Sequence, residues 1–473
     1  MSRDHQGAAD GPTEQSKLAR IFGRIVDVRE DELRALLLSC AYFFCVLSAY
    51  YVLRPIRDEM GIAGGVRNLP WLFTGTLLAT LAAQPFFAAL VARFPRRQFI
   101  PYTYRFFMLN LVGFFILLKV LPAENQVWVG RAFFIWTSVF NLFVVSVFWA
   151  FMADVFHPEQ GKRLFGFIGV GGTAGGIVGG MLTAVLAQRI GPPQLFLISV
   201  VLLELAAQCV RRFPAGVGAA TPAQAEGDVA SADSPAGRQR PAPSANAELP
   251  IGGSIIAGIT HVAKSPYLIG IALYMLLFTL GSTFLYYQQA AIIEQHFTDR
   301  ALRTSVLARI DVAVNVLTIV TQVFLTGRLV RLLGIGVTLA LIPALSVLGF
   351  LGLGLMPSVG LLVTFLVLRR AGEFAVARPV REVLFTVIPR EDKYKAKSFI
   401  DTFVYRAGDQ VGAWSYGIMM WLGMGMAAIA FTAVPIAVVW LLIAIWLGRR
   451  QRALQHAYTG PAIAAHVPAP ARG

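Results

Sequence analysis

The chain has 473 residues, of which 56% are hydrophobic and only 14% carry a charge, and its mean hydropathy is +0.64. A soluble domain usually has about 25% charged residues, so the composition excludes a soluble globular protein and indicates one embedded in a lipid bilayer. The net charge of +15 is compatible with nucleic acid binding, but the basic residues gather in short loops between apolar segments. We therefore expect no nucleic acid partner.

Twelve segments are long and apolar enough to be transmembrane helices, which need about 20 mainly apolar residues each. They span residues 34–54, 69–92, 99–121, 126–152, 164–187, 194–213, 267–292, 305–326, 335–356, 359–387, 398–422 and 426–447. The sequence therefore predicts an all-α membrane protein with twelve transmembrane helices. Residues 1–33 show no cleavable signal peptide, so we expect a polar N-terminal lead and take the first span as the insertion signal.

Lysine and arginine are concentrated in alternate loops, which places these loops in the cytoplasm by the positive-inside rule. The loops follow spans 2, 4, 8 and 10 and include Arg96, Lys162, Arg328 and Lys395. With an even number of spans both termini are then cytoplasmic, and we expect the inner membrane of a bacterium. Two opposite loops are expected to be exceptions, one with Arg54 and Arg57 and the other with Arg300 and Arg303.

Residues 214–250 are rich in Ala, Pro, Gly and Ser and lack hydrophobic periodicity, so we predict a disordered cytoplasmic linker. This linker separates an N-terminal half, 34–213, from a C-terminal half, 251–448, which is followed by a cytoplasmic tail, 449–473. We expect an interfacial helix near 251–264. Two six-helix repeats joined by a long loop resemble the layout of major-facilitator transporters, whose substrate site lies between the halves.

Span 5 is glycine-rich, and its glycines form two adjacent rows at four-residue spacing. The rows are Gly171, Gly175 and Gly179, and Gly172, Gly176 and Gly180. A dinucleotide-binding loop would require a preceding strand, so we predict close helix packing instead; the alternative is close approach of the backbone to a substrate. The cysteines, Cys40, Cys45 and Cys209, all lie in spans, and we expect no disulfide, metal or cofactor.

Span 10 carries several charges in an otherwise apolar segment. An ionised side chain at this depth is costly and usually faces a protein interior or a water-filled path. Arg378 and Glu382 are spaced as a helical pair, Arg381 shares a face with Arg370 and Glu373, and Pro379 is expected to kink the helix. The charges predict either pairing that holds helices together or, as we favour, a cationic site for an anionic substrate.

Spans 1, 4, 8 and 11 add further polar candidates. Arg54 and Asp58 are spaced for a helical pair, and the alternative is an ordinary charged loop after span 1. In span 11, Arg406 and Asp409 fit either an internal salt bridge or a gating or coupling pair. The remaining candidates are Asp401 near the cytoplasmic end of span 11, Asp154 at the end of span 4, and a polar row of Asp311, Asn315 and Gln322 in span 8, which we expect to face the cavity between the halves.

Three blocks of sequence resemble the ATP:ADP antiporter family, the nucleotide transporters of plastids and obligate intracellular bacteria. Leu53, Arg54, Arg57 and Asp58 are similar to its L-R-x-x-K-D motif. The sequence FWAFMAD, which ends at Asp154, and the later Lys162, Arg163 and Phe165 are similar to F-W-x-F-x-x-E and K-R-F-Y. Pro379, Arg381, Glu382, Lys393, Lys395, Lys397, Ile400 and Asp401 match P-x-K-E, K-x-K-x-K and I-D, with arginine for one lysine.

The resemblance implies that charged residues in these blocks bind and exchange nucleotides. They are Arg57, Asp58, Asp154, Arg381, Glu382, Lys395 and Lys397. Arginine replaces lysine at two motif positions and aspartate replaces glutamate at one. Because each replacement keeps the sign of the charge, we expect a phosphate-bearing or carboxylate substrate.

We therefore predict a monomeric secondary active transporter that moves or exchanges an anionic solute by alternating access. Arg54, Arg57, Arg378 and Arg381 would neutralise the substrate. Salt bridges of Glu382, Asp401 and Asp409 would replace it in the empty site, with Glu373 and Arg406 in gating or coupling roles. The alternative is a proton-coupled exporter of a drug-like or lipidic substrate, in which Asp401 or Asp409 titrates. The sequence shows no nucleophile elbow, metal cluster or phosphate loop, so we do not expect an enzyme.

Overall fold

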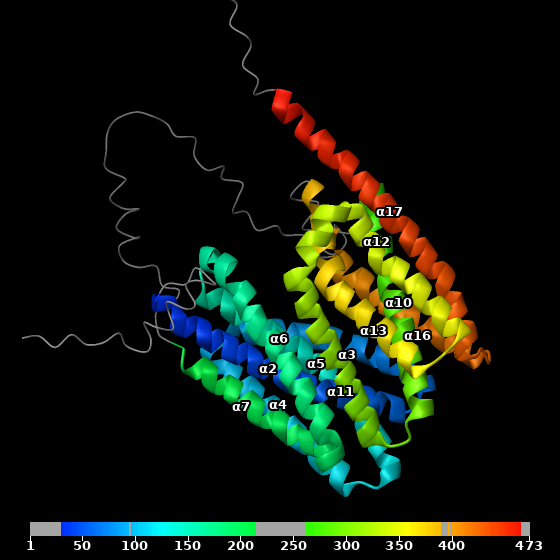
Figure 1. Cartoon of the computed structure of the whole chain (residues 1–473). Coiled ribbons are helices and arrows are strands. Elements are labelled where there is room, and N and C mark those ends of the chain that lie inside the picture. Colours follow the sequence, from blue (N-terminus) through cyan, green and yellow to red (C-terminus); the bar gives the residue numbers. More distant parts are fainter. Residues whose placement is uncertain are drawn as a thin grey trace, which may run out of the picture.

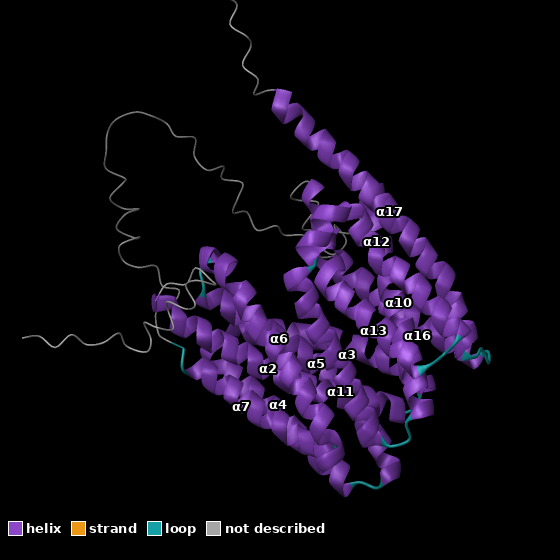
Figure 2. Ribbon diagram, in the orientation of Figure 1, coloured by secondary structure: helices purple, strands orange, loops and turns teal. Residues whose placement is uncertain are grey.

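The computed structural model describes residues 30–93, 96–213, 262–263, 265–388, 396–397 and 399–464, and these residues are helical apart from short turns (Figures 1 and 2). The predicted linker, 214–250, and Lys395 lie outside the described residues. So do most of the predicted N-terminal lead and nearly all of the predicted interfacial helix near 251–264.

The first half consists of six long helices. They are α2 (Glu30–Ala63), α3 (Leu69–Arg93), α4 (Arg96–Val120), α5 (Ala123–Val155), α6 (Pro158–Ile190) and α7 (Leu195–Arg211). The short helices η1 (Val66–Asn68) and η2 (Pro192–Gln194) join α2 to α3 and α6 to α7. In Figure 1 this half lies at the lower left.

The second half also crosses the fold six times. Its helices are α10 (Pro266–His296), α11 (Arg300–Phe324), α12 (Thr326–Leu355), α13 (Val359–Gly372), α14 (Arg378–Leu384), α16 (Tyr405–Trp421) and α17 (Met426–Ala464). Two π-helical segments interrupt this half: η4 (Glu373–Ala377) joins α13 to α14 as one crossing, and η6 (Ile400–Val404) precedes α16. A short 3-10 helix, η5 (Phe385–Val387), follows α14.

These crossings confirm the predicted all-α fold of twelve transmembrane helices in two halves. Within the described residues, nine of the helices are by length and composition alone suited to cross a membrane. Two predicted loops are wrong, because the helices run further than hydropathy indicates. Arg54 and Arg57 lie inside α2, and Arg300 and Arg303 lie in the first turn of α11, where Asp299 caps the helix by accepting a hydrogen bond from the Leu302 amide at 2.7 Å. Helix α17 likewise continues past the predicted span to Ala464.

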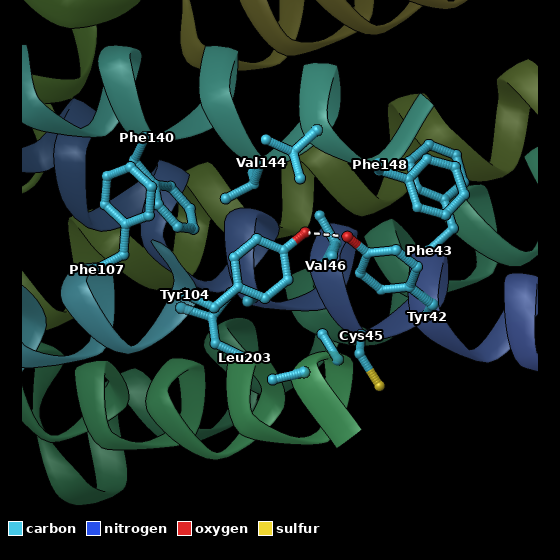
Figure 3. Packing of buried hydrophobic residues seen from close by; sticks show 14 of the residues in the cluster. Tyr42, Phe43, Cys45, Val46, Tyr104, Phe107, Phe140, Val144, Phe148 and Leu203 are labelled. Atoms are coloured by element: carbon cyan, nitrogen blue, oxygen red, sulfur yellow. Dashed lines mark hydrogen bonds between the residues drawn. The ribbon is translucent and has the colours of Figure 1, made fainter. Parts of the chain in front are cut away.

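Aromatic side chains, packed among aliphatic ones, hold helices of the first half together in its interior (Figure 3). Tyr42 of α2 and Tyr104 of α4 are both buried and join their hydroxyl groups in a hydrogen bond. Phe43 stacks on Phe148 of α5 with ring centroids 4.1 Å apart. Each buried hydroxyl therefore has a partner, as an apolar interior requires, and the rings hold α2 against α4 and α5.

The glycine rows of α6 confirm the prediction of close helix packing. A Cβ atom placed on Gly171, Gly175 or Gly179 would meet the backbone carbonyl oxygens of Cys40, Phe44 and Ser48 of α2 at 2.8, 2.3 and 2.3 Å. Because these contacts are too short for a side chain, only glycine lets the two helix backbones approach this closely. In the second row, Gly180 faces Val312 of α11, in the other half.

The two halves touch mainly toward one end of the bundle. We name the end where α7 stops and α10 starts the linker side, and the opposite end the sealed side. Toward the sealed side, Thr74 of α3 donates a hydrogen bond to Gln410 of α16 at 3.0 Å, and Ser305 of α11 donates one to the carbonyl of Ala184 of α6 at 2.6 Å. There too Arg300 binds Glu59 of α2 through two hydrogen bonds of 2.9 and 3.1 Å.

Candidate functional site

A cavity of about 800 Å³ lies between the two halves. Ligand pockets usually measure about 300–1,000 Å³, so it has room for a small organic solute. Its wall includes Asn141 of α5 in the first half and extends to Glu382 and Lys397 on the linker side, whose side chains are partly exposed. The cavity is therefore closed by the contacts of the sealed side and reaches toward the linker side.

Charged side chains dominate the polar part of this wall. Eight are cationic: Arg54, Arg57, Arg369, Arg370, Arg378, Arg381, Lys397 and Arg406. Five are carboxylates: Asp58, Glu373, Glu382, Asp401 and Asp409. Cationic groups thus exceed carboxylates by three among the described lining residues.

The predicted site residues come together here with two exceptions. Asp154 is exposed at the end of α5 and is not part of the cavity wall, so the structure does not place it with the others. Lys395 lies outside the described residues. The predicted cavity-facing row of α11 also needs correction: Asp311 and Asn315 are buried against α2, and Gln322 donates a hydrogen bond to the carbonyl of Phe374 at 3.4 Å.

The π-helical segment η4 determines which charges of span 10 meet. A π-helical turn accommodates an extra residue, so Arg381, eight positions after Glu373, lies where the seventh residue would lie in a regular helix, on the same face. Its guanidinium contacts the Glu373 carboxylate at 3.4 Å, with both side chains 9% exposed. One oxygen of Glu373 and the Nε of Arg381 have no partner in the described structure.

Pro379 explains why the chain is irregular here. Its missing N–H leaves the carbonyl of Ala375, four residues earlier, without its helical donor. The hydroxyl of Thr326 fills this position by donating a hydrogen bond to the Ala375 carbonyl at 2.9 Å. The predicted helical pair of Arg378 with Glu382 is wrong. Glu382 of α14 instead forms an ion pair with Lys397, which lies beyond α14 in the chain.

Helix α2 contributes the charges of the first half. Arg57 contacts Asp58 at 2.9 Å and lies over the ring of Phe134, 3.8 Å from its centroid. Tyr286 of α10 donates a hydrogen bond to the same Asp58 oxygen at 3.1 Å, which ties the two halves together. The predicted pair of Arg54 with Asp58 is wrong, since Arg54 lies 3.5 Å from Asp311 of α11.

Arg369 and Arg370 are further cavity residues that the sequence did not single out as site residues. Arg369 is 2% exposed and donates hydrogen bonds to Ser346, Ser282 and the carbonyl of Phe278. Such a buried cation without a carboxylate at ion-pair distance among the described residues raises the positive potential of the cavity. The signals in the sequence are their position inside a charged span and, for Arg370, the helix face that it shares with Glu373 and Arg381.

Helix α16 and the π-helical segment before it bring the remaining predicted residues to the cavity. Asp401 lies in η6 and is exposed, whereas Asp409 accepts a hydrogen bond of 3.4 Å from Thr283 of α10. Within the described part of the chain, no ion pair joins Arg406 to Asp409, and neither Arg378 nor Arg406 has a carboxylate within 4 Å. Of the two alternatives for Arg406 and Asp409, the internal salt bridge is thus not formed, and Arg378 and Arg406 remain available as cations of the wall.

Solved structures of several transporters share the fold of this chain. The D-xylose-proton symporter superposes with a TM-score of 0.61 at 13% sequence identity, over 88% of this chain and 97% of that one. The nucleoside transporter NupG gives 0.54 at 11% identity, over 89% and 98%. The peptide transporter PepTSo of the POT family gives 0.56 at 15% identity, over 89% and 98%. At these identities the likeness concerns the fold.

The family assignment rests on the sequence. No curated protein matches the chain in sequence. The model of the Major Facilitator Superfamily, however, matches residues 35–408, which include the first half, the second half up to the start of α16, and most of the cavity wall. This chain belongs to the Major Facilitator Superfamily, and it is an integral membrane transporter rather than an enzyme.

Proposed function

We propose that this transporter moves or exchanges an anionic solute through the cavity between its halves. The observation that carries the proposal is the excess of cationic side chains over carboxylates on the cavity wall. Bringing such charges together in a desolvated space is unfavourable unless an anion compensates them. An anionic substrate supplies that compensation each time it binds.

The kind of cation favours oxyanions. Seven of the eight cationic wall residues are arginines, whose planar guanidinium groups match the oxygens of phosphate and carboxylate with two parallel hydrogen bonds. Arg378 and Arg406 are the first candidates to bind the substrate, because neither forms an ion pair with a carboxylate of the described chain. Arg381, with its unpartnered Nε, is a third.

The wall also offers surfaces for an organic part of the substrate. Aromatic rings of Tyr50, Phe73 and Tyr286 lie on it, together with the hydroxyl and amide groups of Ser138 and Asn141. Such a combination suits a nucleotide or a phosphorylated metabolite better than a bare inorganic ion. The resemblance of three sequence blocks to the ATP:ADP antiporter family supports the same substrate class.

The proposed mechanism is alternating access, in which the halves rock about the cavity. If the basic loops on the linker side are cytoplasmic, as the positive-inside rule favours, the described conformation faces the cytoplasm. Opening of the sealed side then exposes the cavity to the other compartment.

The test is exchange by the purified protein in liposomes. Vesicles are loaded with ATP, ADP, inorganic phosphate, a sugar phosphate or an uncharged nucleoside, and efflux is followed after each is offered outside. We expect at least one phosphate-bearing anion to be exchanged and the nucleoside to be inert. Transport of the nucleoside alone would contradict the proposal, and uptake driven by an imposed pH gradient would favour a proton-coupled exporter using Asp401 or Asp409.

A further inference from the structure

One buried carboxylate is shared by two arginines from opposite halves. Asp311 of α11 is 4% exposed, and its Oδ1 atom lies 2.8 Å from Arg370 and 3.5 Å from Arg54. Arg370 belongs to α13 in the same half as Asp311, whereas Arg54 belongs to α2 in the other half. Both arginines line the cavity, and Asp311 lies behind them.

One carboxylate cannot neutralise two guanidinium groups. Arg54 and Arg370 therefore face the cavity with one uncompensated positive charge between them. Their second neutralising charge has to come from outside the trio, and the cavity is the place from which it can arrive. The longer of the two contacts, that of Arg54, is the weaker one, since electrostatic attraction falls with distance.

Alternating access affects the two contacts of Asp311 differently. The contact of Asp311 with Arg370 lies within one half and moves with it as a unit. The contact with Arg54 crosses between the halves, in the seam between α2 and α11. Two other contacts lie in the same seam: Tyr51 donates a hydrogen bond to Asn315 at 3.3 Å, and Arg300 binds Glu59. Opening of the sealed side breaks the Arg54 contact and leaves that of Arg370.

We propose that Asp311 is a positioning residue that competes with the substrate anion for Arg54. In the empty, linker-side-open state Arg54 is held by Asp311; in the loaded state the anion takes Arg54, and Asp311 stays with Arg370. This exchange of partners couples substrate binding to the separation of α2 from α11. The inference rests on the proposed transport of an anion and assigns a role to a carboxylate outside the cavity wall.

The test measures binding of ATP and of inorganic phosphate to the purified protein, and turnover in liposomes. Asp311→Asn removes the competing charge, so we expect the dissociation constant of the bound anion to fall about tenfold and turnover to fall as well, because the anion is no longer displaced. The gain in affinity should vanish when Arg54→Gln is also present, as a double-mutant cycle shows. Glu159→Gln, an exposed carboxylate at the start of α6, is the control for loss of one negative charge.

A second variant tests the inference in the opposite direction. Asp311→Glu extends the carboxylate toward Arg54, so we expect the anion to bind several-fold more weakly. Unchanged affinity in both variants, or a tightening by Asp311→Asn that persists without Arg54, would overturn the role of Asp311. The proposed function fails separately, when wild-type protein binds neither probe and exchanges no anion in liposomes.

Discussion

The ion pair of Arg300 with Glu59 offers a direct test of how the sealed side is kept closed. Glu59 is 1% exposed and accepts both hydrogen bonds of the Arg300 guanidinium, at 2.9 and 3.1 Å. The pair joins the end of α2 to the start of α11, so it exists only while the two halves touch there. Arg300→Ala leaves the Glu59 carboxylate buried without this partner in the closed state, whereas opening lets water reach it.

The size of the effect follows from the burial of the two groups. Removing one partner of a fully buried ion pair costs about 3–5 kcal/mol, whereas exposed pairs contribute about 0.2–1 kcal/mol. Since the Arg300 side chain is 46% exposed, screening by solvent reduces the effect to an intermediate ~1–2 kcal/mol. We therefore expect the equilibrium to shift toward the open sealed side by roughly tenfold, because ~1.4 kcal/mol corresponds to that factor.

The assay is a distance measurement between spin labels on the sealed side. Glu124→Cys in the first half and Gly425→Cys in the second are exposed positions, and the three native cysteines are replaced by alanine. The label distance should lengthen in Arg300→Ala. Arg303→Ala is the matched control, because the hydrogen bonds of Arg303 among the described residues go to the carbonyls of Phe297 and Glu294 in its own half, and Arg303 acts on Glu59 only as a charge at a distance. Equal distance distributions in both variants and the parent would refute this reasoning.

Two further predictions concern helix packing and energy coupling. Gly179→Leu should prevent stable assembly, because its side chain would overlap the Ser48 carbonyl. Gly166→Leu is the control and should keep the wild-type yield and melting temperature, because the space around its Cβ position is open. Equal melting temperatures for the two variants would contradict the close packing of α6 on α2. Exchange by the wild-type protein should continue at the same rate when a protonophore abolishes any pH gradient, and loss of exchange would show that a proton gradient drives transport, with Asp409 the first residue to examine.

Hydropathy predicted the architecture well because burial in lipid imposes the same requirement on every span. The twelve crossings, the division into halves and the close packing of α6 all follow from local composition and spacing. The ends of α2 and α11 were misjudged for a physical reason. Charged residues are tolerated in helices there because they are paired: Arg57 with its neighbour Asp58, which also accepts a hydrogen bond from Tyr286 of α10, and Arg300 with Glu59 of α2. Sequence spacing does not reveal the contacts between helices.

The charge pairs of the site could not be predicted for the same reason. Spacing suggested Arg54 with Asp58 and Arg378 with Glu382, because residues four apart are neighbours on a regular helix. The structure instead pairs Arg54 with Asp311, in the other half of the chain, and Glu382 with Lys397, fifteen residues further along it. Which residues are charged and lie in spans could be predicted, but their partners depend on tertiary packing.

The most direct test of anion transport compares two arginine variants in liposomes loaded with ATP and supplied with labelled phosphate-bearing anions. Arg381 lines the cavity, whereas Arg331 is exposed near the start of α12 and donates its hydrogen bond to Gly327 in its own helix. If the cavity carries an anion, Arg381→Ala inserts normally and loses exchange at least tenfold, while Arg331→Ala exchanges like the wild type. Wild-type exchange by a correctly inserted Arg381→Ala would contradict the account.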